Sequence, residues 1–113
     1  MAITSTRRVI CNFSGDINAQ VDKQAANNAT SPGEIESVPL VSGNNTITPP
    51  TGVTGCTILP PSGNTVLITL KGVAGDTGVP LHLTDPTSIG LNSASALVLN
   101  ALSLAVTIRI VWS

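Results

Sequence analysis

From residue 34 onward, short aliphatic runs alternate with clusters of glycine, proline and asparagine. The clusters recur roughly every 8–12 residues, a spacing typical of strands joined by turns in an all-β sandwich or barrel. No internal repeat of fixed period is present, which argues against a solenoid. The pattern predicts an all-β fold with a single β-sandwich or jelly-roll-like domain of about eight short strands.

The expected strands follow from alternating apolar residues with turn residues at their ends. Residues 65–71 are the clearest case, with Val66, Ile68 and Leu70 facing inward. Pro39 places the strand at 34–41 on a sheet edge or at a bulge. A tight turn is expected at residues 43–45, before a return strand. The remaining candidates are residues 45–48, 55–59, 79–84, 88–91, 95–99 and 106–112.

The N-terminal part has a different character. Residues 7–14 predict a strand, whereas residues 17–30 are polar and have no clean period. A short helix around 19–26 and an extended connecting arm are both open for this segment. Ser31-Pro32-Gly33 predicts a turn. We therefore divide the chain into an N-terminal strand with an extended, irregular arm (1–30) and a β-sandwich domain (31–113).

Charged side chains are scarce. They make up 10% of the chain, and residues 37–113 hold only Lys71, Asp76, Asp85 and Arg109. Soluble domains have about 25% charged residues, and mixed surface charge keeps them dispersed. A net charge of −1 also argues against a nucleic-acid partner, which would require a basic patch. We expect a protein whose neighbours are fixed in an assembly.

The two cysteines, Cys11 and Cys56, each alternate in phase with apolar residues, as buried small hydrophobic side chains do. Residues 1–12 lack the apolar region of a secretory leader. We therefore expect a reducing compartment and favour free thiols over a disulfide. The two aromatic residues, Phe13 and Trp112, are expected to fill the core.

Residues 89–111 are the one stretch that resembles a membrane span. Asparagine and serine interrupt it, and its end alternates like a strand. We expect two strands here and no membrane partner.

The sequence shows no evident set of residues that could act together in catalysis. His82 is the only histidine and lies between two leucines, and the chain has no G-x-S-x-G motif. A surface or interface histidine is the favoured interpretation, because a triad needs three positioned groups. The sequence therefore predicts neither an enzyme nor a small-molecule substrate, and no cofactor.

The sequence also gives little indication of a metal-binding or phosphate-binding site. Asp76 and Asp85 together fall short of the roughly six to eight oxygens that Ca²⁺ takes, and each is expected to cap its own turn. The segment Gly72–Gly78 lacks the Gly-Lys-Ser/Thr ending of a phosphate-binding loop, so a hairpin loop is expected.

Arg7 and Arg8 are the only adjacent basic residues. A basic segment near a terminus binds an acidic protein surface or is simply solvated. Both alternatives remain open, and these two arginines are the only candidates for partner binding.

Much of the chain after residue 30 resembles small structural proteins of tailed bacteriophages. The resemblance lies in Ser31-Pro32-Gly33, Asn64–Gly78, Leu81–Thr87 and the Ile-Val-Trp-Ser ending. Proteins of this kind are short, β-rich and poor in charge. Some decorate or cement capsids, often as trimers, and others belong to tails and fibres. The similarity involves no catalytic motif, so no functional residues carry over.

The resemblance implies a non-enzymatic virion structural protein that is assembled in the host cytoplasm. The favoured role is a capsid decoration (cement) protein that binds and stabilises the major capsid protein lattice. Its expected partners are that lattice and copies of itself, as a homotrimer. The alternative role is a structural component of a phage tail or fibre.

Overall fold

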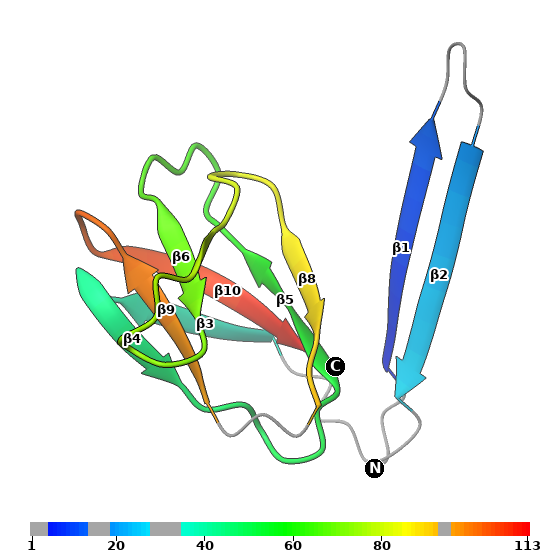
Figure 1. The fold of residues 1–113 in the computed structure, drawn as a ribbon, viewed down its shortest axis with the longest axis horizontal. Helices are drawn as coiled ribbons and strands as arrows, with labels where there is room; N and C mark the ends of the chain where they lie inside the picture. Colours follow the sequence, from blue (N-terminus) through cyan, green and yellow to red (C-terminus); the bar gives the residue numbers. More distant parts are fainter. Residues whose placement is uncertain (1–4, 14–18, 28–34, 93–95) are drawn as a thin grey trace.

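The computed structural model describes residues 5–13, 19–27, 35–92 and 96–113, which contain strands and turns but no helix. Eight strands form two four-stranded antiparallel sheets packed face to face, and two more form a separate hairpin (Figure 1). The predicted all-β sandwich is confirmed. The strands are β1 (Ser5–Phe13), β2 (Ala19–Asn27), β3 (Ile35–Leu40), β4 (Gly43–Ile47), β5 (Gly55–Leu59), β6 (Ile68–Lys71), β7 (Val79–Pro80), β8 (Thr87–Gly90), β9 (Leu97–Ala101) and β10 (Val106–Trp112).

The order of the eight sandwich strands is that of a jelly roll. One sheet has the order β3-β10-β5-β8 and the other β4-β9-β6-β7. The first and last strands of the sandwich pair with each other, and so do the strands nested inside them: β3 pairs with β10, β4 with β9, β5 with β8, and β6 with β7. The pairs β10–β5 and β9–β6 then complete the two sheets. This nested pairing is the jelly-roll arrangement of a double sheet.

The core between the sheets is aliphatic, with one tryptophan. Along β10 the inward residues Ile108, Ile110 and Trp112 are at most 1% exposed, and the intervening Arg109 is exposed. The indole Nε1–H of Trp112 donates to Glu36 Oε2 at 3.0 Å, so its polar atom is satisfied. Cys56 is fully buried with a free thiol, as predicted. The other buried hydrophobic residues are Val38, Leu40, Ile47, Ile58, Val66, Ile68, Leu97, Val98, Leu99 and Ala101.

Most strand predictions are confirmed to within one or two residues. Pro39 lies on an edge strand, because β3 ends its sheet. Val66 and Ile68 are buried and Leu70 is half-buried, although β6 itself begins only at Ile68. The stretch that resembled a membrane span contains two strands, β9 and β10.

The predicted tight turn at residues 43–45 is wrong. β4 begins at Gly43 and pairs with β9 in the opposite sheet instead of returning along β3. Gly43 has a φ of 97°, a left-handed conformation that glycine adopts without steric cost. The Asn45 side chain bonds both the N–H and the C=O of Val41, at 2.9 Å each. The turn residues therefore mark a corner between sheets, which a local pattern cannot distinguish from a hairpin.

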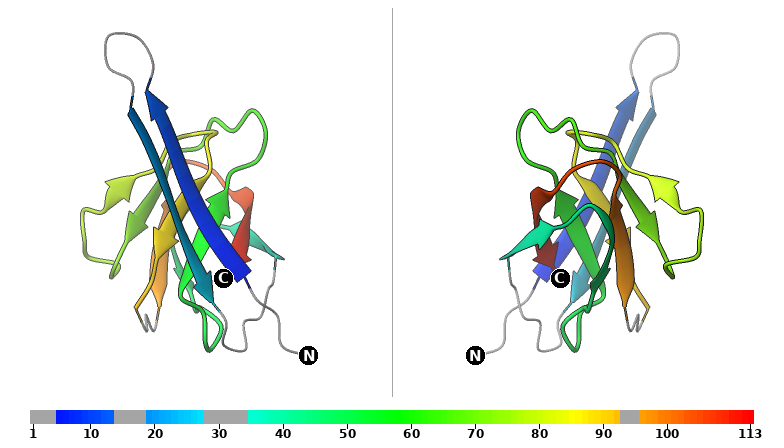
Figure 2. Two further views of the ribbon diagram at one scale, coloured as in Figure 1. Left: turned by 90° about the vertical axis from the view of Figure 1, so that its right-hand side faces the viewer. Right: turned by 90° about the vertical axis from the view of Figure 1, so that its left-hand side faces the viewer.

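The N-terminal arm is a β-hairpin and not an irregular segment. β1 and β2 pair in one continuous register, from Ser5 opposite Asn27 to Phe13 opposite Ala19. The helix considered for residues 19–26 is wrong, because cross-strand pairing with β1 decides the conformation of a segment that has no strong period of its own. The hairpin stands beside the sandwich on the β8 side (Figures 1 and 2). The turn predicted at Ser31-Pro32-Gly33, and the side chains of Cys11 and Phe13, lie outside the described parts of the chain.

Replacing Ile58 with Ala is expected to lower the free energy of unfolding by about 2–5 kcal/mol, because the side chain is fully buried between the sheets. The matched control is Ile35→Ala on β3, where the side chain is 64% exposed and a loss within about 1 kcal/mol is expected. Urea unfolding followed by the fluorescence of Trp112 measures both. Equal losses for the two variants would contradict the core described above.

Candidate functional site

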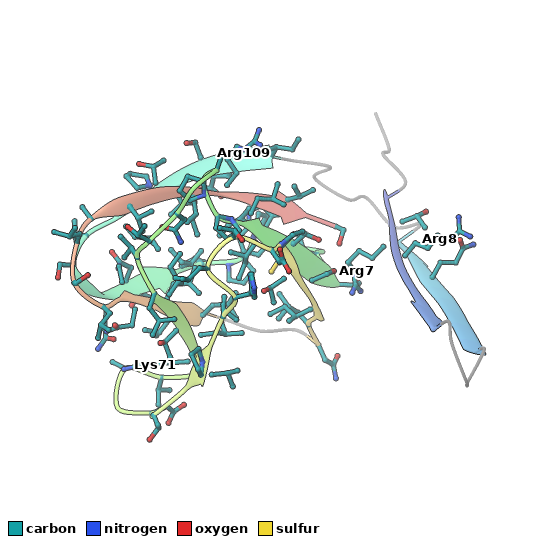
Figure 3. The ribbon with its side chains drawn as sticks, turned by 90° about the horizontal axis from the view of Figure 1, so that it is seen from above. Arg7, Arg8, Lys71 and Arg109 are labelled. Carbon is teal, nitrogen blue, oxygen red and sulfur yellow. The ribbon has the colours of Figure 1, made fainter. Side chains whose placement is uncertain are left out.

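Because side chains alternate along β1, the side chains of Arg7 and Arg8 point to opposite faces of the strand. Arg7 points toward the sandwich and Arg8 points away from it (Figure 3). Arg7 is half-buried, whereas Arg8 is exposed. Arg7 therefore serves within the chain, joining the hairpin to the sandwich, and of the two arginines Arg8 is the one presented outward.

The guanidinium of Arg7 lies against two glycines that are paired across neighbouring strands. Gly55 at the start of β5 lies opposite Gly90 at the end of β8. A Cβ atom built on Gly55 would overlap the guanidinium of Arg7, and one on Gly90 would lie 3.6 Å from its Nη1. Glycine in a strand often marks such a close approach. We call Arg7, Thr54, Gly55 and Gly90 the Arg7 site.

One hydrogen bond joins Arg7 to the sandwich backbone. Arg7 Nη2 donates to the carbonyl oxygen of Thr54 at 3.0 Å. The same oxygen accepts from the backbone N–H of Leu91 at 2.8 Å, so both of its lone pairs are used. The acceptor of this bond is a neutral backbone carbonyl and not a carboxylate.

Ser113, the last described residue, holds the backbone of the Arg7 site in place. The carbonyl oxygen of Ser113 accepts from the N–H groups of Thr54 (2.6 Å) and Gly55 (3.1 Å), and its own N–H donates to the Gly55 carbonyl (2.9 Å). These bonds extend the β5–β10 ladder and hold the start of β5 in place. The position of the Arg7 acceptor therefore depends on β10.

Cys56 lies directly after Gly55 and is fully buried. Burial raises the pKa of its thiol from the ordinary 9.0 to about 11, and the nearby positive charge of Arg7 acts in the opposite direction. The thiol is thus protonated at neutral pH, which makes it a packing group and not a nucleophile.

His82 is exposed, as the sequence predicted, and it organises its own turn. Its Nδ1 accepts the backbone N–H groups of Thr84 (3.2 Å) and Asp85 (2.9 Å). Asp85 Oδ2 lies 3.7 Å from the same nitrogen. The turn predicted to be capped by Asp85 is therefore capped by the histidine ring.

The glycine-rich segment 72–78 is the loop between β6 and β7, as predicted. Asp76 Oδ2 accepts the N–H of Val73 at 3.1 Å, so this aspartate does cap its own turn. An open groove of about 630 Å³ lies beside the loop; five of its ten lining residues are aliphatic, and neither His82 nor Cys56 is among them. Within the described ranges, no group of three His, Cys, Asp or Glu side chains could hold a metal ion.

The roles of Thr54, Gly55 and Gly90 are not evident from the sequence. The only available signal is a glycine at one end of each of two short strands, which does not reveal what approaches it.

No helix in the described residues is long and apolar enough to cross a membrane. The chain matches no protein-family model, no curated protein and no solved structure.

Arg7→Ala is expected to release the hairpin from the sandwich, because the variant loses both the bond to the Thr54 carbonyl and the contact with the paired glycines. Amide hydrogen exchange in residues 5–13 and 19–27 should become faster, with little change in β9 and β10. Arg8→Ala is the matched control, since it leaves the Arg7 site intact. Equal exchange rates in the two variants would rule out this role for Arg7.

The raised pKa of Cys56 predicts a loss of stability at alkaline pH. Between pH 9.0 and about 11 the thiol keeps its proton in the fold and loses it in the unfolded chain. The unfolded state then binds fewer protons, so the free energy of unfolding falls as pH rises, by up to about 2–3 kcal/mol. Urea unfolding at several pH values should show a steeper fall for the natural chain than for Cys56→Ala. Identical slopes would contradict the assignment.

Proposed function

We propose that this chain is a non-enzymatic virion structural protein, and specifically a capsid decoration protein that binds and stabilises the lattice of the major capsid protein. The resemblance to small structural proteins of tailed bacteriophages supports the proposal. The jelly roll is compatible with it, because viral capsid domains use this fold. Since a fold hosts many functions, the proposal depends on the surface and not on the fold alone.

The observation that carries the proposal is the hairpin arm, formed by β1 and β2, which stands beside a sandwich with few charged residues. Among the described strands, β1 and β2 pair only with each other. Two-stranded hairpins are marginally stable in water unless something packs against them. Neighbouring subunits of a lattice would supply that packing. Many weak contacts, repeated by symmetry, then bind tightly without any single strong site.

The charge distribution suggests how the protein divides its contacts. Seven of the eleven charged residues lie in the first 36 positions, and the sandwich from residue 37 has four. In this proposal the hairpin arm lies across the shell with Arg8 facing a neighbour. The sandwich projects and packs among copies or capsid subunits, where few charges have to be desolvated.

The test compares capsids that lack this protein with the same capsids after it has been added. Particles are heated, and genome release is followed with a DNA-binding dye. Bound protein should raise the release temperature, because it bridges neighbouring subunits. Equal release temperatures, together with no co-sedimentation with capsids, would refute the decoration role. Binding to isolated tails and not to capsids would favour the tail or fibre role.

A variant lacking residues 1–8 tests the arm. It should bind capsids more weakly, because half of β1 and both arginines are missing. Its sandwich is checked by urea unfolding monitored at Trp112, which lies in the core. Unchanged capsid binding would show that this part of the arm makes no contact with the lattice.

A further inference from the structure

The His82 ring caps the turn that leads from β7 to β8. Its Nδ1 atom accepts the backbone N–H groups of Thr84 at 3.2 Å and Asp85 at 2.9 Å. A ring nitrogen that accepts hydrogen bonds carries no proton, so the cap requires the neutral form of the histidine. The turn is therefore held by a group that loses this capacity when it is protonated.

Asp85 offers the same ring nitrogen a second partner. Its Oδ2 atom lies 3.7 Å from His82 Nδ1, which places a carboxylate beside the ring once the ring is charged. While the ring is neutral, both atoms are acceptors and form no bond with each other. Nδ1 thus has two alternative partners, the backbone N–H groups of the turn and the Asp85 carboxylate, and a proton decides between them.

Both ends of the turn are anchored independently of the cap. The buried Asn64 side chain donates to the carbonyl oxygen of Leu83 at 2.8 Å. At the other end, Thr87 begins β8 and pairs with Ile58 of β5. Loss of the cap therefore frees residues 84–86 and leaves the strands of the sandwich paired.

The strands that border the turn supply no further titratable group. The residue before the histidine donates its N–H to the carbonyl of Ile68 at 2.8 Å, so the turn lies beside the start of β6. Residues 57–70 and 86–100 contain no Asp, Glu, His, Cys, Lys or Arg. Lys71 is at the opposite end of β6, and Asp76 lies in the loop that follows it. A response of this turn to mild acid is therefore assigned to the histidine and its neighbouring aspartate.

We propose that His82 is a pH switch for the turn at residues 82–85. The neutral ring caps the turn. In mildly acidic solution, where histidine takes up a proton, Nδ1 becomes a donor, gives up both N–H groups and turns to the Asp85 carboxylate. Exposed ion pairs contribute little to stability, so the change concerns the turn and not the fold. The inference does not rest on the proposed function.

The experiment follows the backbone amide signals of the isolated full chain by NMR between pH 8 and pH 5. Protection of the Thr84 and Asp85 amides from solvent exchange is measured relative to the unstructured rate at each pH. It should fall about 2- to 10-fold on acidification, because each amide loses one hydrogen bond. The amides of β10 should keep their protection. Unchanged protection of Thr84 and Asp85 would overturn the proposal.

His82→Asn is the matched control, because an asparagine oxygen accepts the N–H group two residues on and does not titrate. In this variant the protection of Thr84 should be independent of pH, and a fall as large as in the natural chain would overturn the proposal. Asp85→Asn keeps the histidine and both N–H groups, so the response should persist. Its loss would assign the response to the aspartate and not to the histidine.

The His82 side chain is 61% exposed and that of Asp85 74%, so neither substitution should disturb the fold. Fluorescence of the buried Trp112 checks this in each variant. The capsid-binding test does not depend on the turn, so the two proposals fail independently.

Discussion

Burial of aliphatic side chains from the last two strands holds the two sheets together. β10 pairs with both β3 and β5, and β9 pairs with both β4 and β6, so each is an inner strand of its sheet. Leu99, Ile110 and Trp112 from these strands are fully buried. Their partners are distant in sequence, and such non-local pairing makes folding slow. The Arg7 site is positioned by β10, since Ser113 follows that strand and bonds to Thr54 and Gly55.

Asparagine side chains satisfy much of the backbone in this charge-poor chain. Asn45 holds the corner between the sheets. Asn64 is buried and joins two loops, donating to the carbonyls of Val66 (2.9 Å) and Leu83 (2.8 Å) and accepting from the Val66 N–H (3.0 Å). Asn100 donates to the side-chain oxygen of Asn44 at 2.8 Å across β4 and β9. Neutral amides pair these groups without adding charge.

The hairpin and the sandwich differ in charge. The hairpin meets the sandwich through the positively charged Arg7 side chain, which donates to the neutral carbonyl of Thr54, just before β5. Seven charged residues lie in the first 36 positions, whereas the sandwich from residue 37 has four. The proposal of a hairpin arm that contacts the capsid lattice rests on this difference.

The sequence alone determined the fold class, most strand positions and the aliphatic core, because alternation and turn residues act over a few neighbouring positions. It placed β5 and β10 correctly and put Ile58, Trp112 and Cys56 inside. Only the tertiary structure decided that the residues after Val41 cross to the opposite sheet, that residues 19–27 form a strand, and that Arg7 lies on Gly55 and Gly90. Each of these depends on a partner far along the chain, and no local pattern records which distant backbone will come into contact.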